Sequence, residues 1–232
     1  ATCDTTGGNE ITECKCGVNG YSPRNFETYY GNSSLHSQTV VTGIDWARKG
    51  TGVLKYYADG RELGTQSSVP SGKYASNRCE LGTIPYRYDA GDDVYYTASF
   101  YLPSRYWEDK TLYSIIITQW KITDNPHGAL RVSNLGDYKL YYEGGSLVDN
   151  TEIGTAKPDA WNDVKIYYKK SLSSDGRIRI YLNGAKVFEH EGKNMFDRRS
   201  DGSGGYLKFG MYTEIRSERV IYFDAVSMTS GR

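Results

Sequence analysis

The segment from Tyr206 to Glu214 would place chemically useful side chains on one face of a β-strand. Residues two apart in a strand point the same way, so Leu207, Phe209 and Met211 would form its core-facing side. The other side would carry Tyr206, Lys208, Gly210, Tyr212 and Glu214. Phenol and ammonium groups bind ligands and move protons, and a glycine between them would leave room for a ligand. The segment therefore predicts a polar, basic and phenolic binding face.

Two other segments offer polar pairs by the same rule. Gln119 and Lys121 share one side of a strand, and Gln119 follows a run of isoleucines that is typical of a strand buried on both faces. Arg78 and Glu80 share one side of the segment around residue 79. Outward faces of antiparallel strands are normally polar, so each pair taken alone is also compatible with a solvated surface.

Short strands must position these residues, because period-two alternation dominates the chain after residue 35. The predicted strands are Asp93–Leu102, Thr111–Lys121, Gly128–Asn134, Asp163–Lys169, Arg177–Leu182, Tyr206–Glu214 and Val220–Met228. Turn signals separate them at 90–92, 143–145, 174–176 and 183–184. No stretch predicts an amphipathic helix of any length. Regularly spaced strands with polar loops predict an all-β jelly-roll sandwich of two antiparallel sheets, with residues 1–232 as a single domain.

The charge balance gives no reason to expect nucleic acid or a membrane as a partner. Lys plus Arg and Asp plus Glu are equal at 28 each, so any affinity for a polyanion must come from local clustering. The chain starts with Ala and has no long apolar run, which is typical of a mature secreted protein. We therefore expect an extracellular protein, and a monomer by default.

The four cysteines predict disulfides rather than a metal site. Cys3, Cys14, Cys16 and Cys79 lack the spacing of zinc ligands, and Cys14 and Cys16 are too close to bridge comfortably. One bond within the N-terminal segment and one from it to Cys79 would result, and which cysteine reaches Cys79 stays open. Residues 1–35 are then a disulfide-pinned extension, in which Asn32 begins an N-glycosylation sequon.

Three motifs together resemble the signature strands of jelly-roll polysaccharide lyases. They are Asn-Arg-Cys-Glu-Leu at 77–81, Gln-Trp-Lys at 119–121 and Tyr-Leu-Lys-Phe-Gly-Met-Tyr at 206–212. The intervening sequence is similar to the heparin lyase I and glucuronan lyase branch, and the length suits the fungal glucuronan lyases of polysaccharide lyase family twenty. The resemblance covers roughly residues 40–228. It implies a concanavalin-like sandwich with a concave substrate-binding face.

The resemblance also implies β-elimination on a uronate. The C5 proton lies next to a carboxylate, whose charge must be neutralised before that proton can leave. Arg78, Gln119 and a lysine suit this task, and Tyr212 is the candidate base and acid. A tyrosine phenol ordinarily has a pKa of about 10, so Lys208 or Arg78 would have to stabilise the phenolate. No cofactor is required for this chemistry.

The chain departs from the family where relatives carry a histidine, because Lys121 stands third in its Gln-x-His motif. We expect Lys121 to replace the histidine as a charge neutraliser. His127 or His36 could instead enter the site from outside the motif, although an ordinary surface role is expected for both and for His190.

Further residues are expected to hold the substrate or to stabilise the fold. Glu80, Arg131 and Tyr206 are candidate substrate-binding residues, and Lys139, Tyr141 and Tyr142 could hold flanking uronates by charge and ring stacking. Asp224 matches a position where related jelly rolls often hold a structural Ca²⁺, and a solvated aspartate is the alternative.

Two other functions fit the same sandwich. A non-catalytic lectin-like module would also use aromatic and basic residues, but it would not need Lys208, Tyr212, Gln119 and Arg78 to converge. A glycoside hydrolase would need two close carboxylates, and Glu80 and Glu214 lie on different strands. The expected activity is endolytic cleavage of β-1,4-glucuronan, with alginate and heparin-like polymers as alternatives.

Overall fold

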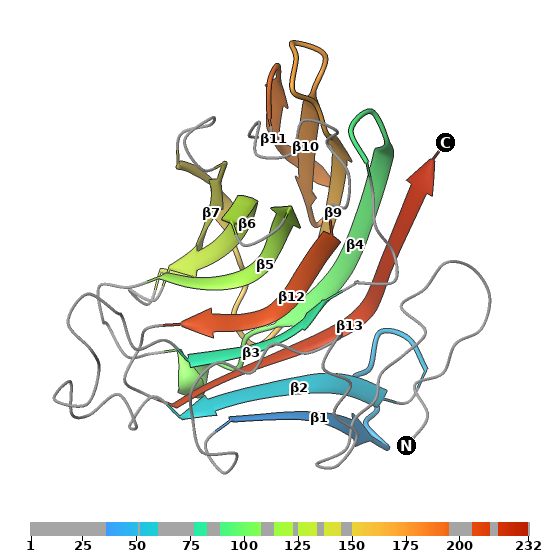
Figure 1. The fold of residues 1–232 in the computed structure, drawn as a ribbon. Coiled ribbons are helices and arrows are strands. Elements are labelled where there is room, and N and C mark those ends of the chain that lie inside the picture. The colour runs from blue at the N-terminus through green and yellow to red at the C-terminus, as the bar shows by residue number, and fades with distance from the viewer. Residues whose placement is uncertain are drawn as a thin grey trace, which may run out of the picture.

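The structure is a computed structural model, and it describes residues 36–50, 52–59, 77–82, 89–107, 114–122, 125–133, 137–144, 150–194, 206–213 and 218–231. Side chains of residues 36–40, 59, 77–82, 121, 122, 125–127, 206, 213, 230 and 231 are not part of that description. Within it the chain forms two antiparallel β-sheets that face one another (Figure 1).

The larger sheet has seven strands, all paired antiparallel. Its order is β1 (His36–Thr42), β2 (Gly52–Asp59), β13 (Glu218–Gly231), β4 (Asp93–Tyr101), β9 (Trp161–Lys169), β10 (Arg177–Leu182) and β11 (Ala185–Glu191). A short 3₁₀ turn, η3 (Ser104–Tyr106), follows β4. Strands far apart in sequence are therefore neighbours at the centre of this sheet.

The smaller sheet has six strands and carries all three motifs. Its order is β3 (Asn77–Gly82), β12 (Tyr206–Thr213), β5 (Ser114–Ile122), β6 (Asn125–Ser133), β7 (Lys139–Glu143) and β8 (Thr151–Thr155). The three motif segments form β3, β12 and β5, which are adjacent strands. Residues separated by more than 100 positions are thereby brought to one place.

The core lies between the two sheets and is rich in aromatic rings. Phe209 of the smaller sheet contacts Tyr56 and Phe223 of the larger one, with ring centroids 6.3 and 5.5 Å away. Alternation explains the burial: β10 and β9 each bury every second residue. Trp107, after η3, is fully buried and donates its indole N–H to the carbonyl of Val220 at 2.8 Å.

The predicted sandwich of two antiparallel sheets is confirmed. Seven predicted strands correspond to β4, β5, β6, β9, β10, β12 and β13, with ends displaced by a few residues. The Asn183-Gly184 turn joins β10 to β11 with positive φ angles of 50° and 85°, as a tight hairpin requires. The sequence prediction missed β1, β2, β7, β8 and β11.

Some predictions fall outside the described residues. Cys3, Cys14, Cys16 and Asn32 lie in residues 1–35, outside the description, and Cys79 is described only by its backbone in β3. The disulfides, the sequon, the role of residues 1–35 and the single domain remain predictions. No helix in the described part of the chain is long and apolar enough to cross a membrane.

Candidate functional site

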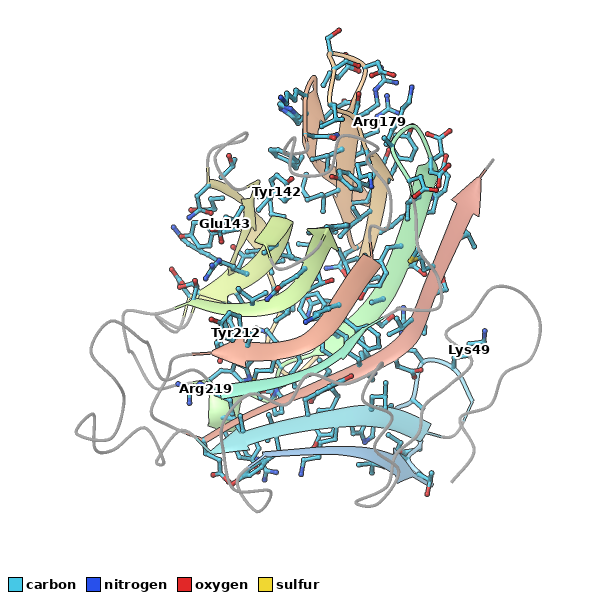
Figure 2. The ribbon with its side chains drawn as sticks, viewed as in Figure 1. Lys49, Tyr142, Glu143, Arg179, Tyr212 and Arg219 are labelled. Carbon is cyan, nitrogen blue, oxygen red and sulfur yellow. The ribbon has the colours of Figure 1, made fainter. Side chains whose placement is uncertain are left out.

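Strand β12 divides its side chains between the core and the opposite face as predicted. Leu207, Phe209 and Met211 are buried in the core between the sheets. Lys208 and Tyr212 alternate with them and so point to the outer side of the six-stranded sheet. Tyr212 lies near the C-terminal end of the strand (Figure 2).

Lys208 lies directly opposite Gln119 of β5 in the strand register. Directly opposed residues of an antiparallel pair share a face, with Cβ atoms about 5 Å apart. Both side chains are nearly inaccessible, at 3% and 2% exposure. The hydroxyl of Thr118 donates to the carbonyl of Lys208 at 2.7 Å, which ties the two strands together at this point. The prediction missed Thr118, although a threonine within a buried isoleucine run signals such a bond.

The amide nitrogen of Gln119 is a buried donor without a hydrogen-bond partner among the residues that the structure describes. Leaving such a group unpaired costs about 1–3 kcal/mol, so a native protein that keeps one usually has a reason. A ligand oxygen at this face would supply the missing acceptor. The prediction that Gln119 sits in a buried strand is confirmed.

A β-bulge in β5 sets the direction of Gln119. The pairing of β5 with β6 shifts between Ile116 and Thr118, which adds one residue to the strand. Ile116 and Gln119 are three residues apart, yet both lie opposite outward-facing residues of β12. Strict alternation would have turned one of them into the core.

Gly210 has a backbone role that the sequence prediction did not include. Its φ angle is 140°, which favours glycine, and the register between β12 and β5 shifts between Phe209 and Tyr212. The expectation was that this glycine leaves room for a ligand. The observed reason for a glycine is the conformation of the shift itself, which sets the position of Tyr212 relative to Lys208.

Tyr212 lies in register with Arg78 of β3 on one side and with Ile116 of β5 on the other. The same register places Glu80 opposite Gly210 and Lys121 opposite Tyr206. The side chains of Arg78, Glu80, Lys121 and Tyr206 lie outside the description, so their predicted roles remain predictions. The backbone brings all of these positions to three adjacent strands, as the motifs required.

Arg131 of β6 continues the row that contains Tyr212, because it lies opposite Ile116. Its guanidinium forms an ion pair with Glu143 and a 3.4 Å hydrogen bond with Ser114. A carboxylate of the substrate would therefore compete with Glu143 for this arginine. Its substrate-binding role remains a prediction.

The three flanking residues have different environments. Lys139 is half-exposed and pairs with Glu152 at 3.0 Å, a hydrogen bond that raises the pKa of the lysine. Tyr141 lies opposite Arg131 and is half-buried. The prediction for Tyr142 is wrong: the residue is buried in the core, where its ring contacts Trp120 and Phe188, and burial raises the pKa of its phenol. Neighbouring strand residues point to opposite faces, so Tyr141 and Tyr142 could not both face a substrate.

Two of the three histidines cannot be placed in the site. His36 and His127 are described by backbone only. His190 lies on the edge strand β11, half-buried, with a 3.4 Å contact to the carbonyl of Lys193. It is on the larger sheet, away from the motif strands.

Asp224 is held by backbone hydrogen bonds, and its predicted role as a calcium ligand remains a prediction. Its carboxylate accepts backbone N–H bonds from Arg48 at 2.6 Å, from Lys49 at 3.0 Å and from Ala225 at 2.6 Å. Three of the roughly four acceptor sites of this carboxylate are thereby used. No group of three or more His, Cys, Asp or Glu side chains in the described ranges could hold a metal. The bonds from Arg48 and Lys49 fasten the loop after β1 to β13.

The sequence profile of polysaccharide lyases matches residues 65–227, which include all three motifs. This chain belongs to the polysaccharide lyase family. The family resemblance stated from the motifs is thereby confirmed, and the chain is a lyase that acts on polysaccharides. No curated protein sequence matched it.

Solved structures show the same fold in other polysaccharide lyases. An endo-β-1,4-glucuronan lyase from the fungus Trichoderma reesei superposes with a TM-score of 0.65 at 19% identity, over 92% of each chain. An alginate lyase of polysaccharide lyase family 7 gives 0.56 at 15%, over 88% of this chain and 85% of that one. An alginate lyase from a Corynebacterium species gives 0.51 at 14%, over 83% and 93%. At these identities the likeness shows the jelly-roll fold.

Proposed function

We propose that this polysaccharide lyase cleaves β-1,4-linked polyglucuronate within the chain by β-elimination and leaves an unsaturated uronate at the new end. The observation that carries the proposal is the buried amide nitrogen of Gln119 beside Lys208, which has no hydrogen-bond partner among the described residues. A dry face that offers a hydrogen-bond donor and a cation is suited to a carboxylate. A lectin that binds neutral sugars would not need a buried donor and a cation side by side.

Gln119, Arg78 and Lys121 would bind the carboxylate of the uronate whose C5–H bond breaks. Neutralising this carboxylate lets negative charge develop on it as the proton leaves, which stabilises the enolate-like intermediate. Gln119 and Lys121 come from one strand and Arg78 from another, so the group would be held from two sides.

Tyr212 would move the proton. As the phenolate it takes the proton from C5, the C5–H electron pair forms the C4–C5 double bond, and the bond from C4 to the O4 leaving group breaks. The phenol then returns its proton to O4. In a glucuronate ring the C5 proton and O4 lie on the same side, so one residue can do both. Lys208, four residues earlier on the same face, would stabilise the phenolate.

The choice of glucuronan rests on the comparison with the Trichoderma reesei endo-β-1,4-glucuronan lyase, which spans 92% of both chains. Alginate and heparin-like polymers remain the alternatives, because alginate lyases share the fold at lower TM-scores. We also propose a secreted, monomeric protein with an endolytic mode of attack.

The test incubates the protein with glucuronan, alginate and heparin while the ultraviolet absorbance of the unsaturated uronate is followed. We expect absorbance to rise on glucuronan, and Tyr212→Phe to lower the rate by roughly a hundredfold to ten-thousandfold. Tyr181→Phe is the matched control, because Tyr181 is a half-buried tyrosine on β10 of the other sheet. Binding without any rise in absorbance on all three polymers would contradict the proposal and favour a lectin.

A further inference from the structure

The outer face of the seven-stranded sheet carries both large hydrophobic side chains that are exposed in the described part of the chain. They are Trp46 at 37% exposure, in the loop after β1, and Tyr95 at 41%, on β4. Tyr95 alternates with buried Val94 and Tyr96, so it points away from the core. This face lies on the sheet opposite the motif strands.

Trp46 belongs to a built aromatic cluster. Tyr222, Tyr101 and Trp161 lie directly opposite one another across β13, β4 and β9. The ring of Trp46 packs over this row, with centroids 5.1 Å from Tyr222, 5.2 Å from Tyr101 and 5.6 Å from Trp161. The indole N–H of Trp161 donates to the carbonyl of Trp46 at 2.6 Å. The exposed ring is therefore held in place rather than free on a loop.

Tyr95 forms a second cluster further along the same face. It lies opposite Tyr167 of β9, with ring centroids 5.1 Å apart. The phenol of Tyr167 donates to Asp93 at 2.7 Å, and burial together with this bond raises its pKa to about 12. Tyr101 and Tyr95 are six residues apart on one strand, so the two clusters are separated by roughly 20 Å.

Three cations near these rings form no ion pair with a carboxylate in the described part of the chain. Lys165 lies 5.8 Å from the ring of Tyr95, and in the described part of the chain it forms no ion pair. Lys55 lies opposite Tyr222 in register, again without an ion pair to a described carboxylate. The guanidinium of Arg105 lies 4.6 Å from the ring centroid of Tyr106. Burial raises the pKa of Tyr222, and the nearby charge of Arg105 opposes that rise.

Three carboxylates on this face have bonding partners other than Lys165, Lys55 and Arg105. Asp163 pairs with Arg48, Asp93 accepts from Tyr167, and Asp159 accepts the backbone N–H of Ser104 at 2.9 Å. Other cations of the same sheet already have a carboxylate partner. Arg179 of β10 (Figure 2) pairs with Glu189, as does Lys186. Exposed rings beside cations that form no ion pair with a described carboxylate complement a chain of sugars that bear carboxylates.

We infer that this aromatic face, formed by Trp46, Tyr95, Tyr101, Trp161, Tyr167 and Tyr222, is a second, non-catalytic binding site for a uronate polysaccharide. Sugar rings stack on Trp46 and Tyr95, and carboxylates pair with Lys165, Lys55 and Arg105. The site keeps the enzyme on a polymer between cleavage events. The choice of ligand rests on the proposed function, whereas the location rests on the rings and charges themselves.

The test measures retention of the protein during native electrophoresis through gels that contain glucuronan, alginate or the neutral polymer dextran. All variants carry Tyr212→Phe, so that the gel polymer is not degraded. We expect the double variant Tyr95→Ala with Lys165→Ala to lose roughly three- to tenfold in affinity for an acidic polymer. Lys186→Ala, an exposed lysine of the same sheet that already pairs with Glu189, is the control and should bind normally.

A kinetic measurement with Tyr212 intact separates this site from the catalytic one. The double variant should cleave a short uronate oligosaccharide at the wild-type rate and the long polymer with a raised KM. Equal retention of the double variant and the control would overturn the inference, as would failure of the parent protein to be retained by either acidic polymer. Retention lost on Tyr95 and Lys165 substitution, without cleavage by the wild type, would support this site while contradicting the proposed lyase reaction.

Discussion

At the scale of single residues, Gln119 combines a cost in stability with a role in binding. Its amide nitrogen is buried without a partner in the described part of the chain, although Lys208 lies directly opposite. Buried amides of this kind destabilise the free protein because water has been removed and nothing replaces it. The residue is better explained by a ligand than by packing.

Gln119→Leu should therefore separate stability from activity. A leucine of similar volume removes the unpaired donor, so the free energy of unfolding should rise by about 1 kcal/mol or stay unchanged. The rate of polymer cleavage should fall by roughly a hundredfold or more, because the donor to the uronate carboxylate is lost. Thermal unfolding and the absorbance assay measure the two effects. A large loss of stability would show that Gln119 is a structural residue.

Asp224 leads to a prediction about both stability and metal. Asp224→Ala leaves the N–H groups of Arg48, Lys49 and Ala225 without their acceptor, which should lower the free energy of unfolding by about 1–3 kcal/mol. A chelator should leave the melting temperature of the wild type unchanged, because backbone N–H groups that donate to this carboxylate hold it in place without a cation. A melting temperature that falls with chelator and recovers with calcium would contradict this account.

At the scale of strands, the register shift in β12 is the feature that sets the site. Gly210, with its φ angle of 140°, allows the shift between Phe209 and Tyr212. A side chain in this region of backbone space costs about 1–3 kcal/mol. Gly210→Ala should lower the melting temperature and move Tyr212 relative to Lys208, so kcat should fall more than KM changes. Ala129→Gly on β6, two strands away in the same sheet, is a control for stability, and equal kcat in both variants would contradict the prediction.

The edge hairpin β10–β11 should respond to acid. Hydrogen bonds from Lys186 first and Arg179 second lower the pKa of Glu189 to about 2 from its usual value of about 4.5. A lowered pKa gives stability that is present above about pH 4.5 and is lost as the pH falls towards 2. Glu189→Gln should thus melt below the wild type at neutral pH, and the difference should shrink between about pH 5 and pH 2. A constant difference across this range would contradict the prediction.

Much of the strand pattern could be predicted, because alternation is a local signal. Strands β9 and β10 bury every second residue, and their predicted ranges nearly match. Strand β11 gave no such signal, since it is an edge strand in which no residue is buried. The bulge at Ile117 could not be predicted either, because it depends on the pairing of β5 with β6 and β12.

The candidate site divides in the same way. The spacing of Lys208 and Tyr212 was enough to predict that they share a face. The position of Gln119 beside Lys208 could be established only from the family motifs and then the strand register. The aromatic face could not be predicted, since Trp46, Tyr101, Trp161 and Tyr222 come from four distant segments. Only the strand order brings such residues together.

At the scale of the whole molecule, the proposed reaction and the inferred retention of polymer are assigned to different sheets. The six-stranded sheet holds the residues proposed for catalysis, and the seven-stranded sheet holds the aromatic face. The aromatic core joins the two sheets. Phe209 follows Lys208 in sequence, and its ring packs on Tyr56 and Phe223 of the opposite sheet. The backs of both functional faces therefore rest on the same packed layer.

Phe209→Ala should consequently affect catalysis through packing. Removing a fully buried phenylalanine typically costs about 3–5 kcal/mol, and the cavity would lie behind the strand that carries Lys208 and Tyr212. Because a cavity in a close-packed interior loosens the residues around it, kcat on polymer should fall even well below the new melting temperature. The aromatic face is built on β4, β9 and β13, so retention by acidic gels should stay near the wild-type value. The test measures thermal unfolding, cleavage rate and retention on the same sample. Cleavage and retention lost in equal proportion would mean global unfolding, whereas loss of cleavage alone would locate the effect on β12.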